Sequence, residues 1–141
     1  MADTMSPEDK LAVQELIADY ALRLDSGDLD GYVDNFTEDG VFEGTSGRFE
    51  GRDAVRAYVG HLMETRGDGP TLRHVLGIPS IHGDATRCHA QTYVIIPGQK
   101  GDAPISIPLV GVYTDEIVKV DGRWRFAKRN VRMDLIGPER R

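Results

Sequence analysis

The apolar residues of the chain follow two different periods, and the change from one to the other falls near residue 70. Before that point they recur every three or four residues, which is the spacing of a helix with one buried face. After it, β-branched and polar residues alternate, as they do in strands with one buried face. Helices followed by strands predict an α+β fold.

Three helices are expected in the first half. Ser6, Pro7 and Asp9 resemble an N-cap, a proline at the first helical position and an approximate capping box, so the first helix runs from Pro7 to about Leu24. Between the other two helices, "TEDGVFEG" predicts a turn and a short strand. These helices carry apolar stripes at Leu29, Tyr32, Val33 and Phe36, and at Val55, Tyr58, Val59, Leu62 and Met63.

Four strands are expected in the second half: Leu72–Leu76, extending at most to Ile81, then Ala85–Ile96, Ile105–Val120 and Arg123–Met133. The Asp-Gly pair in "VKVDGRWRF" suits a type I′ turn. The Gly- and Pro-rich loop 97–104 is expected to arch over an opening. Three amphipathic helices on a curved, mostly antiparallel sheet make a cone with an apolar pocket inside.

Size and composition narrow the range of functions. With 141 residues, 40% hydrophobic and 28% charged, residues 1–141 are expected to form a single domain. No apolar run is long enough for a membrane and no signal-peptide pattern is visible, so we expect a cytoplasmic protein without a membrane partner. The net charge of −6 argues against a nucleic-acid partner. Cys88 is the only cysteine and no Cys/His cluster has zinc spacing, so we expect no metal and no cofactor.

Two ionisable residues fall on faces that should be buried. Asp25 follows the stripe of the first helix, where it either points inward or starts the "DSGD" turn by accepting hydrogen bonds from backbone amides. His74 alternates with Leu72 and Leu76, so it shares their inward face. A lone histidine in a strand is usually structural, but a carboxylate across the cavity would fix its tautomer and raise its basicity. His61, His82 and His89 are expected to face away from the pocket.

Four stretches carry a resemblance that covers nearly the whole chain: "YALRLDSGDLDGYVDNFTEDGVF", "GRDAV", "LRHVLG" and "GVYTDEIVKVDGRWRFAKRNV". Together they resemble the SnoaL-like branch of the NTF2-like superfamily, which implies a cone of three helices on a curved sheet. Scytalone dehydratase, hexachlorocyclohexane dehydrochlorinase and bile acid 7α-dehydratase in that branch use an Asp–His dyad, and Asp25 and His74 match its two positions. Arg129 matches an arginine of the last two enzymes, and Tyr20 matches a tyrosine of the bile acid enzyme.

The sequence also departs from the family pattern. Scytalone dehydratase has a tyrosine just before its Asp and a second pocket histidine, where this chain has Leu24 and Ala90. This difference argues against a naphthalene-type substrate handled in the same way. Alternation places Trp124 and Phe126 on the face opposite Arg129 unless a bulge intervenes, which would leave Arg129 on the surface.

These residues suit a cofactor-independent lyase that eliminates water from a small hydrophobic substrate, with polycyclic and steroid-like compounds among the candidates. His74, oriented by Asp25, would be the general base, while Arg129 or Tyr20 would stabilise the developing negative charge. Tyr113, which is expected at the pocket mouth, would bind substrate with Tyr58, Val59 and Leu72. Two alternatives remain open: a ketosteroid-isomerase-like shift of a double bond, and a non-catalytic binding or assembly module in which the pair serves folding. An open cavity that reaches His74 is required by both enzymatic hypotheses.

The outer face of the sheet is expected to be covered by another copy of the chain. Val110, Val112 and Val118 fall opposite the pocket side, and a broad apolar face is rarely left bare. We therefore expect a homo-oligomer, and a trimer rather than a dimer because the dehydratase-like relatives are trimers.

Overall fold

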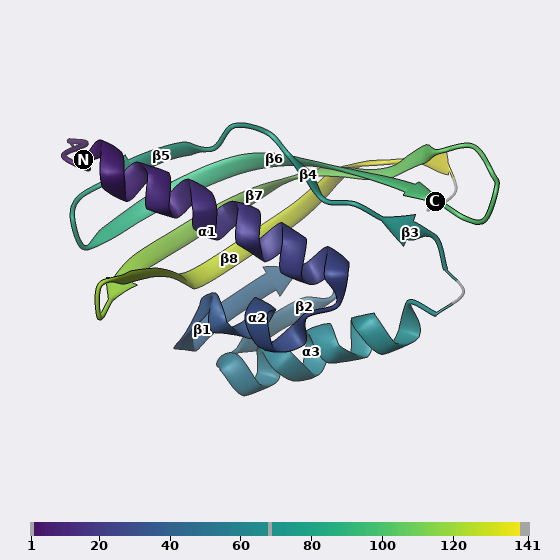
Figure 1. Ribbon diagram of the computed structural model, residues 1–141, viewed down its shortest axis with the longest axis horizontal. Helices are drawn as coiled ribbons and strands as arrows, with labels where there is room; N and C mark the ends of the chain where they lie inside the picture. The colour runs from purple at the N-terminus through teal and green to yellow at the C-terminus, as the bar shows by residue number, and fades with distance from the viewer. Residues whose placement is uncertain (1, 68, 139–141) are drawn as a thin grey trace.

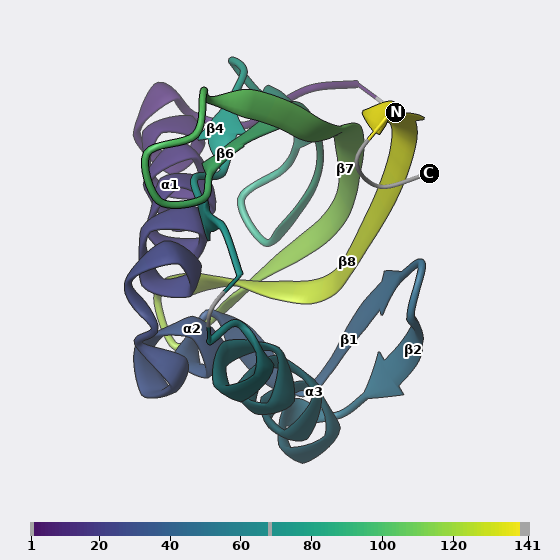
Figure 2. The ribbon, with the colours of Figure 1, turned by 90° about the vertical axis from the view of Figure 1, so that its right-hand side faces the viewer.

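Three helices close one side of a strongly curled sheet. The computed structural model describes residues 2–67 and 69–138. Its helices are α1 (Pro7–Ser26), α2 (Leu29–Asp34) and α3 (Arg52–Thr65). In Figures 1 and 2, β6, β7 and β8 curve around an interior that α1 flanks on one side and α2 and α3 close below. The strands are β1 (Phe36–Gly44), β2 (Gly47–Glu50), β3 (Thr71–Leu72), β4 (Val75–Leu76), β5 (Ser80–Gly83), β6 (Arg87–Gln99), β7 (Ser106–Val120) and β8 (Arg123–Ile136).

The strands form one mixed sheet in which antiparallel pairs dominate. Its order is β2-β1-β8-β7-β6-β3, and β4 and β5 also pair with β6. The contact between β1 and β8 is parallel, while the long β6–β7 and β7–β8 ladders are antiparallel. The α+β architecture expected from the sequence, with helices first and a curved sheet second, is therefore confirmed.

The first helix is built as its sequence predicts. The N–H of Asp9 donates to Ser6 Oγ at 3.1 Å, which satisfies one of the free amides at the helix start. The helix ends at Gly27, whose φ of 79° is the left-handed conformation that favours glycine at this position. Its buried face is Val13, Leu16, Ile17, Tyr20, Ala21 and Leu24. In the described part of the chain, no helix combines the length and apolar character that crossing a bilayer requires.

The second helix is shorter than predicted. Phe36 was expected on its apolar stripe, but the helix ends at Asp34 and Phe36 opens β1 instead. It pairs with Phe126 on β8 and is fully buried against the rings of Tyr20 and Tyr32. Phe36 cannot continue the helix and pair with β8 at the same time, so the helix ends before it. The hairpin partner β2 was not predicted at all.

The first predicted strand is broken around His74. Instead of one strand over Leu72–Leu76, the chain makes two short contacts with β6, at β3 and β4, and then a third at β5. His74 lies between β3 and β4, where its backbone N–H donates to Asp25 rather than to the sheet. The alternation nevertheless holds, because Leu72, His74 and Leu76 are partly buried while Arg73 and Val75 are exposed.

A bulge in β8 decides which residues face inward. Glu116 pairs with Lys128 and Ile117 pairs with Phe126, so Ala127 has no partner on β7. The extra residue is the bulge that the strict alternation had to exclude, and it returns Arg129 to the buried face that holds Trp124 and Phe126. The turn before β8 is as predicted, since Asp121 and Gly122 both have positive φ, at 51° and 78°.

Candidate active site

A pocket of about 410 Å³ opens inside the curl of the sheet. Its lining includes Thr45 and Ser46 from the β1–β2 turn and Thr65 and Arg66 at the end of α3. No residue of the predicted arch, 97–104, is among those that line it. The side chains around it are mainly apolar and aromatic: Leu24, Phe42, Tyr58, Val59, Leu62, Leu72, Ile96, Leu109, Val131 and Met133, with Tyr20, Tyr32, Tyr113 and His74. A concave, mostly apolar site with few polar groups is typical of small-molecule binding.

Asp25 and His74 meet at one wall of this pocket. The ring Nδ1 of His74 lies 2.6 Å from Asp25 Oδ1, and the backbone N–H of His74 donates to Asp25 Oδ2 at 2.9 Å. The two side chains are 12% and 14% exposed, respectively, so the pair is shielded from solvent without being sealed. Both carboxylate oxygens are thus bound to the same residue, which fixes the imidazole in place and orientation.

The charge state of Asp25 determines the tautomer of the ring. Burial acts to raise the pKa of Asp25, but the hydrogen bonds from the ring and the backbone N–H of His74 outweigh it and hold that pKa below its usual value. At neutral pH the carboxylate is therefore ionised and can only accept hydrogen bonds. The hydrogen between the residues belongs to Nδ1, and a neutral ring keeps its free lone pair on Nε2. His74 lines the pocket, so Nε2 is the nitrogen of this ring that remains available as a base.

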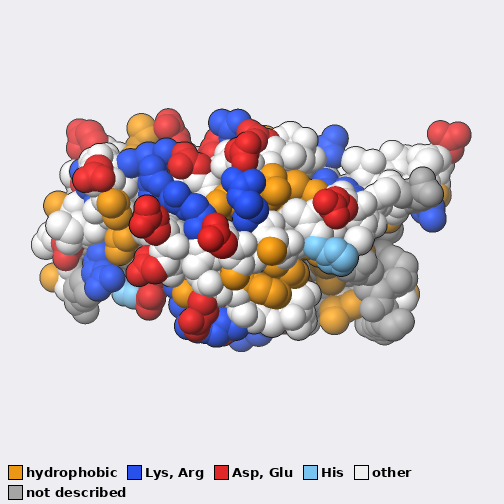
Figure 3. Space-filling view, turned by 90° about the horizontal axis from the view of Figure 1, so that it is seen from below, with side chains coloured by type: hydrophobic (Ala, Val, Ile, Leu, Met, Phe, Trp, Pro, Cys, Tyr) orange, Lys and Arg blue, Asp and Glu red, His pale blue; other side chains and the backbone are white. Residues whose placement is uncertain are grey.

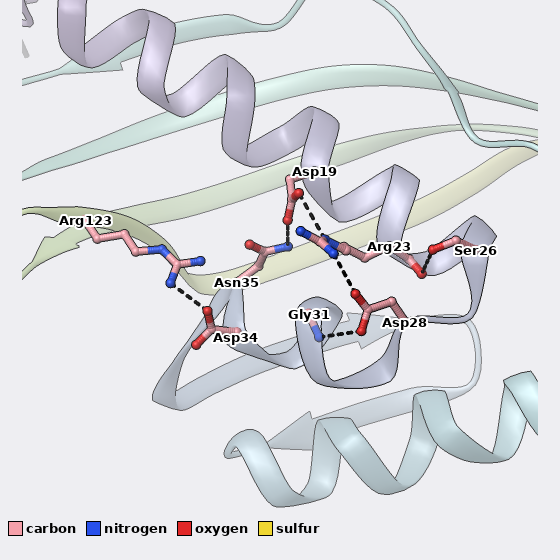
Figure 4. Close-up of polar contacts among 8 residues, drawn as sticks. All are labelled: Asp19, Arg23, Ser26, Asp28, Gly31, Asp34, Asn35 and Arg123. Atoms are coloured by element: carbon pink, nitrogen blue, oxygen red, sulfur yellow. Dashed lines mark hydrogen bonds and ion pairs between the residues drawn. The ribbon is translucent and has the colours of Figure 1, made fainter.

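Asp25 belongs to the last turn of α1. Figure 4 shows polar contacts of Asp19, Arg23 and Asp28 around this end of the helix. Arg23 donates to Asp19 at 3.2 Å and to Asp28 at 2.6 Å, and Asp28 in turn accepts from the N–H of Gly31 at the start of α2. From the other side, the guanidinium of Arg66 donates to the carbonyl oxygens of Leu24 and Asp25 at 3.2 and 3.5 Å. The last turn of α1 is thereby tied to both neighbouring helices.

Three tyrosines form a second polar group in the pocket lining. The hydroxyl of Tyr32 donates to the hydroxyl of Tyr20 at 2.9 Å, and the Tyr113 ring meets the Tyr20 ring edge to face with centroids 5.8 Å apart. All three side chains are buried, and burial raises the pKa of each hydroxyl, so they remain protonated donors. Tyr113, expected at the mouth, is almost fully buried instead because its ring packs against Tyr20.

Arg129 lies behind these rings and is not among the residues that line the pocket. Its side chain is fully buried, its Nε donates to Asp115 Oδ1 at 2.9 Å, and its guanidinium carbon is 4.1 Å from the Tyr20 ring centroid and 3.6 Å from that of Tyr113. Arg129 therefore faces the interior but does not reach the open space of the pocket, and its predicted role in stabilising charge stays a prediction. The bulge turns the residue inward, but the tyrosines stand between it and the open space.

The remaining predicted binding residues, Tyr58, Val59 and Leu72, all line the pocket. Tyr58 is stacked between Phe49 and Phe42, with centroid distances of 4.1 and 5.7 Å. Sequence reasoning did not name most of the other lining residues, among them Tyr32, Phe42, Leu109, Val131 and Met133. Alternation along β8 would have predicted that Val131 and Met133 face inward if it had been counted from Arg129, after the bulge.

Other candidate groups lie apart from this site. His61, His82 and His89 are exposed, as expected, and Cys88 is buried, which together with nearby carboxylates raises the pKa of its thiol to about 12. Over residues 2–67 and 69–138, no three His, Cys, Asp or Glu side chains are grouped so that they could hold a metal ion. Figure 3 shows acidic and basic side chains interspersed on the face below α3, without a separate basic area.

Comparison with known protein families shows which family the chain belongs to. The sequence profile of the SnoaL-like domain matches residues 5–130, which is most of its length. The chain belongs to the SnoaL-like family. No curated protein is similar enough in sequence to this SnoaL-like protein to count as a relative.

Solved structures share the fold of this SnoaL-like protein. An NTF2-like protein with a cystatin-like fold from Novosphingobium aromaticivorans has a TM-score of 0.80 at 21% identity, covering 94% of this chain and 86% of its own. Rv3472 of Mycobacterium tuberculosis, of unknown function, has a TM-score of 0.80 at 29% identity, covering 94% and 79%. A candidate scytalone dehydratase from N. aromaticivorans has a TM-score of 0.78 at 23% identity, covering 92% and 86%. The fold is therefore NTF2-like, as the sequence resemblance predicts.

Proposed function

We propose that this protein is a cofactor-independent lyase of the dehydratase type, acting on a small hydrophobic carbonyl compound. The observation that carries the proposal is the arrangement of His74: Nδ1 is held by an ionised carboxylate at 2.6 Å, while the residue itself lines an open apolar pocket. A histidine kept only for folding would not need an accessible cavity at its free nitrogen. The tyrosine hydroxyls in the same lining supply donors for a substrate oxygen.

In the proposed reaction, Nε2 of His74 removes a proton from the carbon beside the carbonyl group. The electrons of that C–H bond move toward the carbonyl oxygen, and Tyr20 donates a hydrogen bond to the oxygen as negative charge develops. Asp25 stabilises the imidazolium that forms. The electrons then return to make the carbon–carbon double bond, and the neighbouring C–O bond breaks. The leaving hydroxide takes the proton from the imidazolium and departs as water, so the histidine ends neutral.

The pocket supports a hydrophobic substrate of limited size. Its volume of about 410 Å³ lies in the range of sites that enclose small organic ligands, and aliphatic and aromatic groups make up most of its lining. The candidate scytalone dehydratase among the structural neighbours carries a name in keeping with this reaction class. The departure at Leu24 still argues for a substrate held differently from a naphthalene.

The test is an incubation of the protein in deuterated buffer with a panel of cyclic β-hydroxy ketones and unsaturated ketones, followed by proton NMR and mass spectrometry. Loss of one water together with deuterium exchange beside the carbonyl supports the lyase. A shift of the double bond without loss of water identifies an isomerase, and binding without exchange identifies a non-catalytic module. Either of the last two results overturns the proposal.

Variants make the test specific to the dyad. His74→Gln is expected to abolish exchange, and Asp25→Asn to slow it by about 10²- to 10⁴-fold, the usual range for a positioned acid–base group. His82→Gln is the matched control, since this histidine is exposed on β5. Equal activity in His74→Gln and His82→Gln would show that His74 is not the general base.

We also propose that the convex face of the sheet is covered by a second copy of the chain. Ile95, Val110 and Leu135 lie opposite one another across β6, β7 and β8, and Leu135 is 63% exposed. Tyr93, 74% exposed, lies two residues before Ile95 on the same face. Val112, expected in this surface, is already buried within the single chain. A contiguous apolar area of this kind is typical of an interface.

A further inference from the structure

Arg129 is a buried cation whose hydrogen-bonding capacity is mostly unused. Its Nε donates to Asp115, but Nη1 and Nη2 have no hydrogen-bond partner among the described residues, and neither does Asp115 Oδ2. The faces of three aromatic rings surround the guanidinium carbon, with centroids 3.6 Å away for Tyr113, 4.1 Å for Tyr20 and 4.5 Å for Phe126. The charge is therefore directed at the ring faces.

Folding alone gives no clear reason for a charge at this place. Removing a cation and a carboxylate from water costs several kcal/mol for each ion, and well-packed apolar residues often replace such a pair without loss of stability. Here the geometry is also incomplete, since one of five guanidinium N–H groups is bonded. What the pair does produce is a fixed positive charge directly behind two pocket tyrosines.

We propose that Arg129 is a positioning residue that acts on the pocket through Tyr20 and Tyr113, whose hydroxyls it makes stronger hydrogen-bond donors toward a substrate oxygen. The inference rests on the proposed function and deepens it. As negative charge builds on the substrate oxygen, the hydrogen bond transfers part of it to the tyrosine hydroxyl. A cation against the tyrosine ring stabilises the negative charge on that hydroxyl. Asp115 partly neutralises the charge of Arg129 and so limits how strongly Arg129 acts on the two tyrosine hydroxyls.

The electrostatics of the tyrosines agree with this role. Burial raises the pKa of Tyr20 and Tyr113, and the charge of Arg129 opposes that rise, while Asp115 adds to it. The three elements involved are α1, β7 and β8, so the arrangement exists only in the folded protein. It also explains why an arginine that does not line the pocket points inward behind its wall.

The experiment titrates one hydroxyl directly. A fluorinated tyrosine, whose hydroxyl is more acidic, is introduced at position 20, and its pKa is followed by fluorine NMR in three backgrounds: the parent chain, Asp115→Asn, and the double variant Asp115→Asn with Arg129→Met. Asp115→Asn is expected to lower that pKa relative to the parent. The double variant is expected to raise it by about 1 or more above Asp115→Asn, since both lack the carboxylate and differ in the cation. The control is Arg125→Met, which replaces a partly exposed arginine on the same strand and should leave the pKa of the tyrosine at position 20 unchanged.

Equal pKa values in the single and double variants would overturn the proposal, as would a lower pKa in the double variant than in Asp115→Asn. If the double variant does not fold, Asp115→Asn alone decides, because a pKa that does not fall when the carboxylate is removed would show that the charges of this pair do not act on Tyr20. Since the titration involves no turnover, it is independent of whether the protein is a lyase, and a failed lyase assay leaves it intact. With an active substrate in hand, the double variant should lower kcat by about 10- to 100-fold with little change in KM.

Discussion

The buried pair of Asp115 and Arg129 predicts an unusual dependence of stability on pH. A carboxylate beside a guanidinium usually has a lowered pKa and stabilises the fold above that value. For Asp115, burial outweighs the attraction of Arg129 and raises the pKa from 3.8 to about 6. A group whose pKa is higher in the folded than in the unfolded chain contributes stability below its unfolded pKa, and this contribution is lost as pH rises through the folded value.

The magnitude follows from the difference between the two pKa values. Each pH unit corresponds to about 1.4 kcal/mol, so the contribution of Asp115 should decline by about 3 kcal/mol between roughly pH 4 and pH 7. Asp115→Asn removes this titration and keeps the shape of the side chain. The free energy of unfolding of the parent minus that of Asp115→Asn should therefore fall by about this amount over that range.

Urea unfolding followed by tryptophan fluorescence, repeated at half-unit steps of pH, measures both curves. Because all other titrating groups are common to the two chains, their contributions cancel in the difference. A difference that rises with pH would mean that the pair behaves as an ordinary salt bridge, and that attraction outweighs burial. Parallel curves would mean that Asp115 does not titrate in this range, and either result refutes the reasoning.

Further predictions concern the dyad, the pocket, the sheet and the outer face. Asp25→Asn should remove the strongly deshielded Nδ1 proton resonance of the imidazole from the proton NMR spectrum, and persistence of that signal would place the hydrogen elsewhere. Val131→Trp should fill the pocket and abolish binding of hydrophobic ketones by calorimetry while circular dichroism stays unchanged. Gly111→Ala should lower the free energy of unfolding by about 1 to 3 kcal/mol, because its Cβ would lie 2.4 Å from a β8 carbonyl oxygen. Tyr93→Lys should reduce the particle mass in light scattering, and an unchanged mass would exclude this face as the interface.

Local signals were sufficient to predict much of the fold. The stripe on α1, its N-cap and the turn at Asp121 and Gly122 each depend on a few neighbouring residues, and each is found as predicted. The prediction was wrong where a long-range contact competes with a local period. Phe36 continues a helical stripe in the sequence, but its pairing with Phe126 places it in a strand.

The sequence alone determined the order of helices and strands, the inward alternation of His74 and the candidate pairing with Asp25. These follow from period and residue type, which are local properties of the chain. Only the tertiary structure decided that Arg129 lies behind the pocket wall, because the unpaired Ala127 in β8 shifts the alternation of the residues that follow it and turns Arg129 inward. It also decided the tyrosine group, since Tyr20, Tyr32 and Tyr113 come from two helices and a strand that meet only after folding. Asp115 lies 14 residues before Arg129 in the chain, and folding brings the two together where water is excluded. Because the pair is buried, the attraction between its charges is stronger than it would be in water.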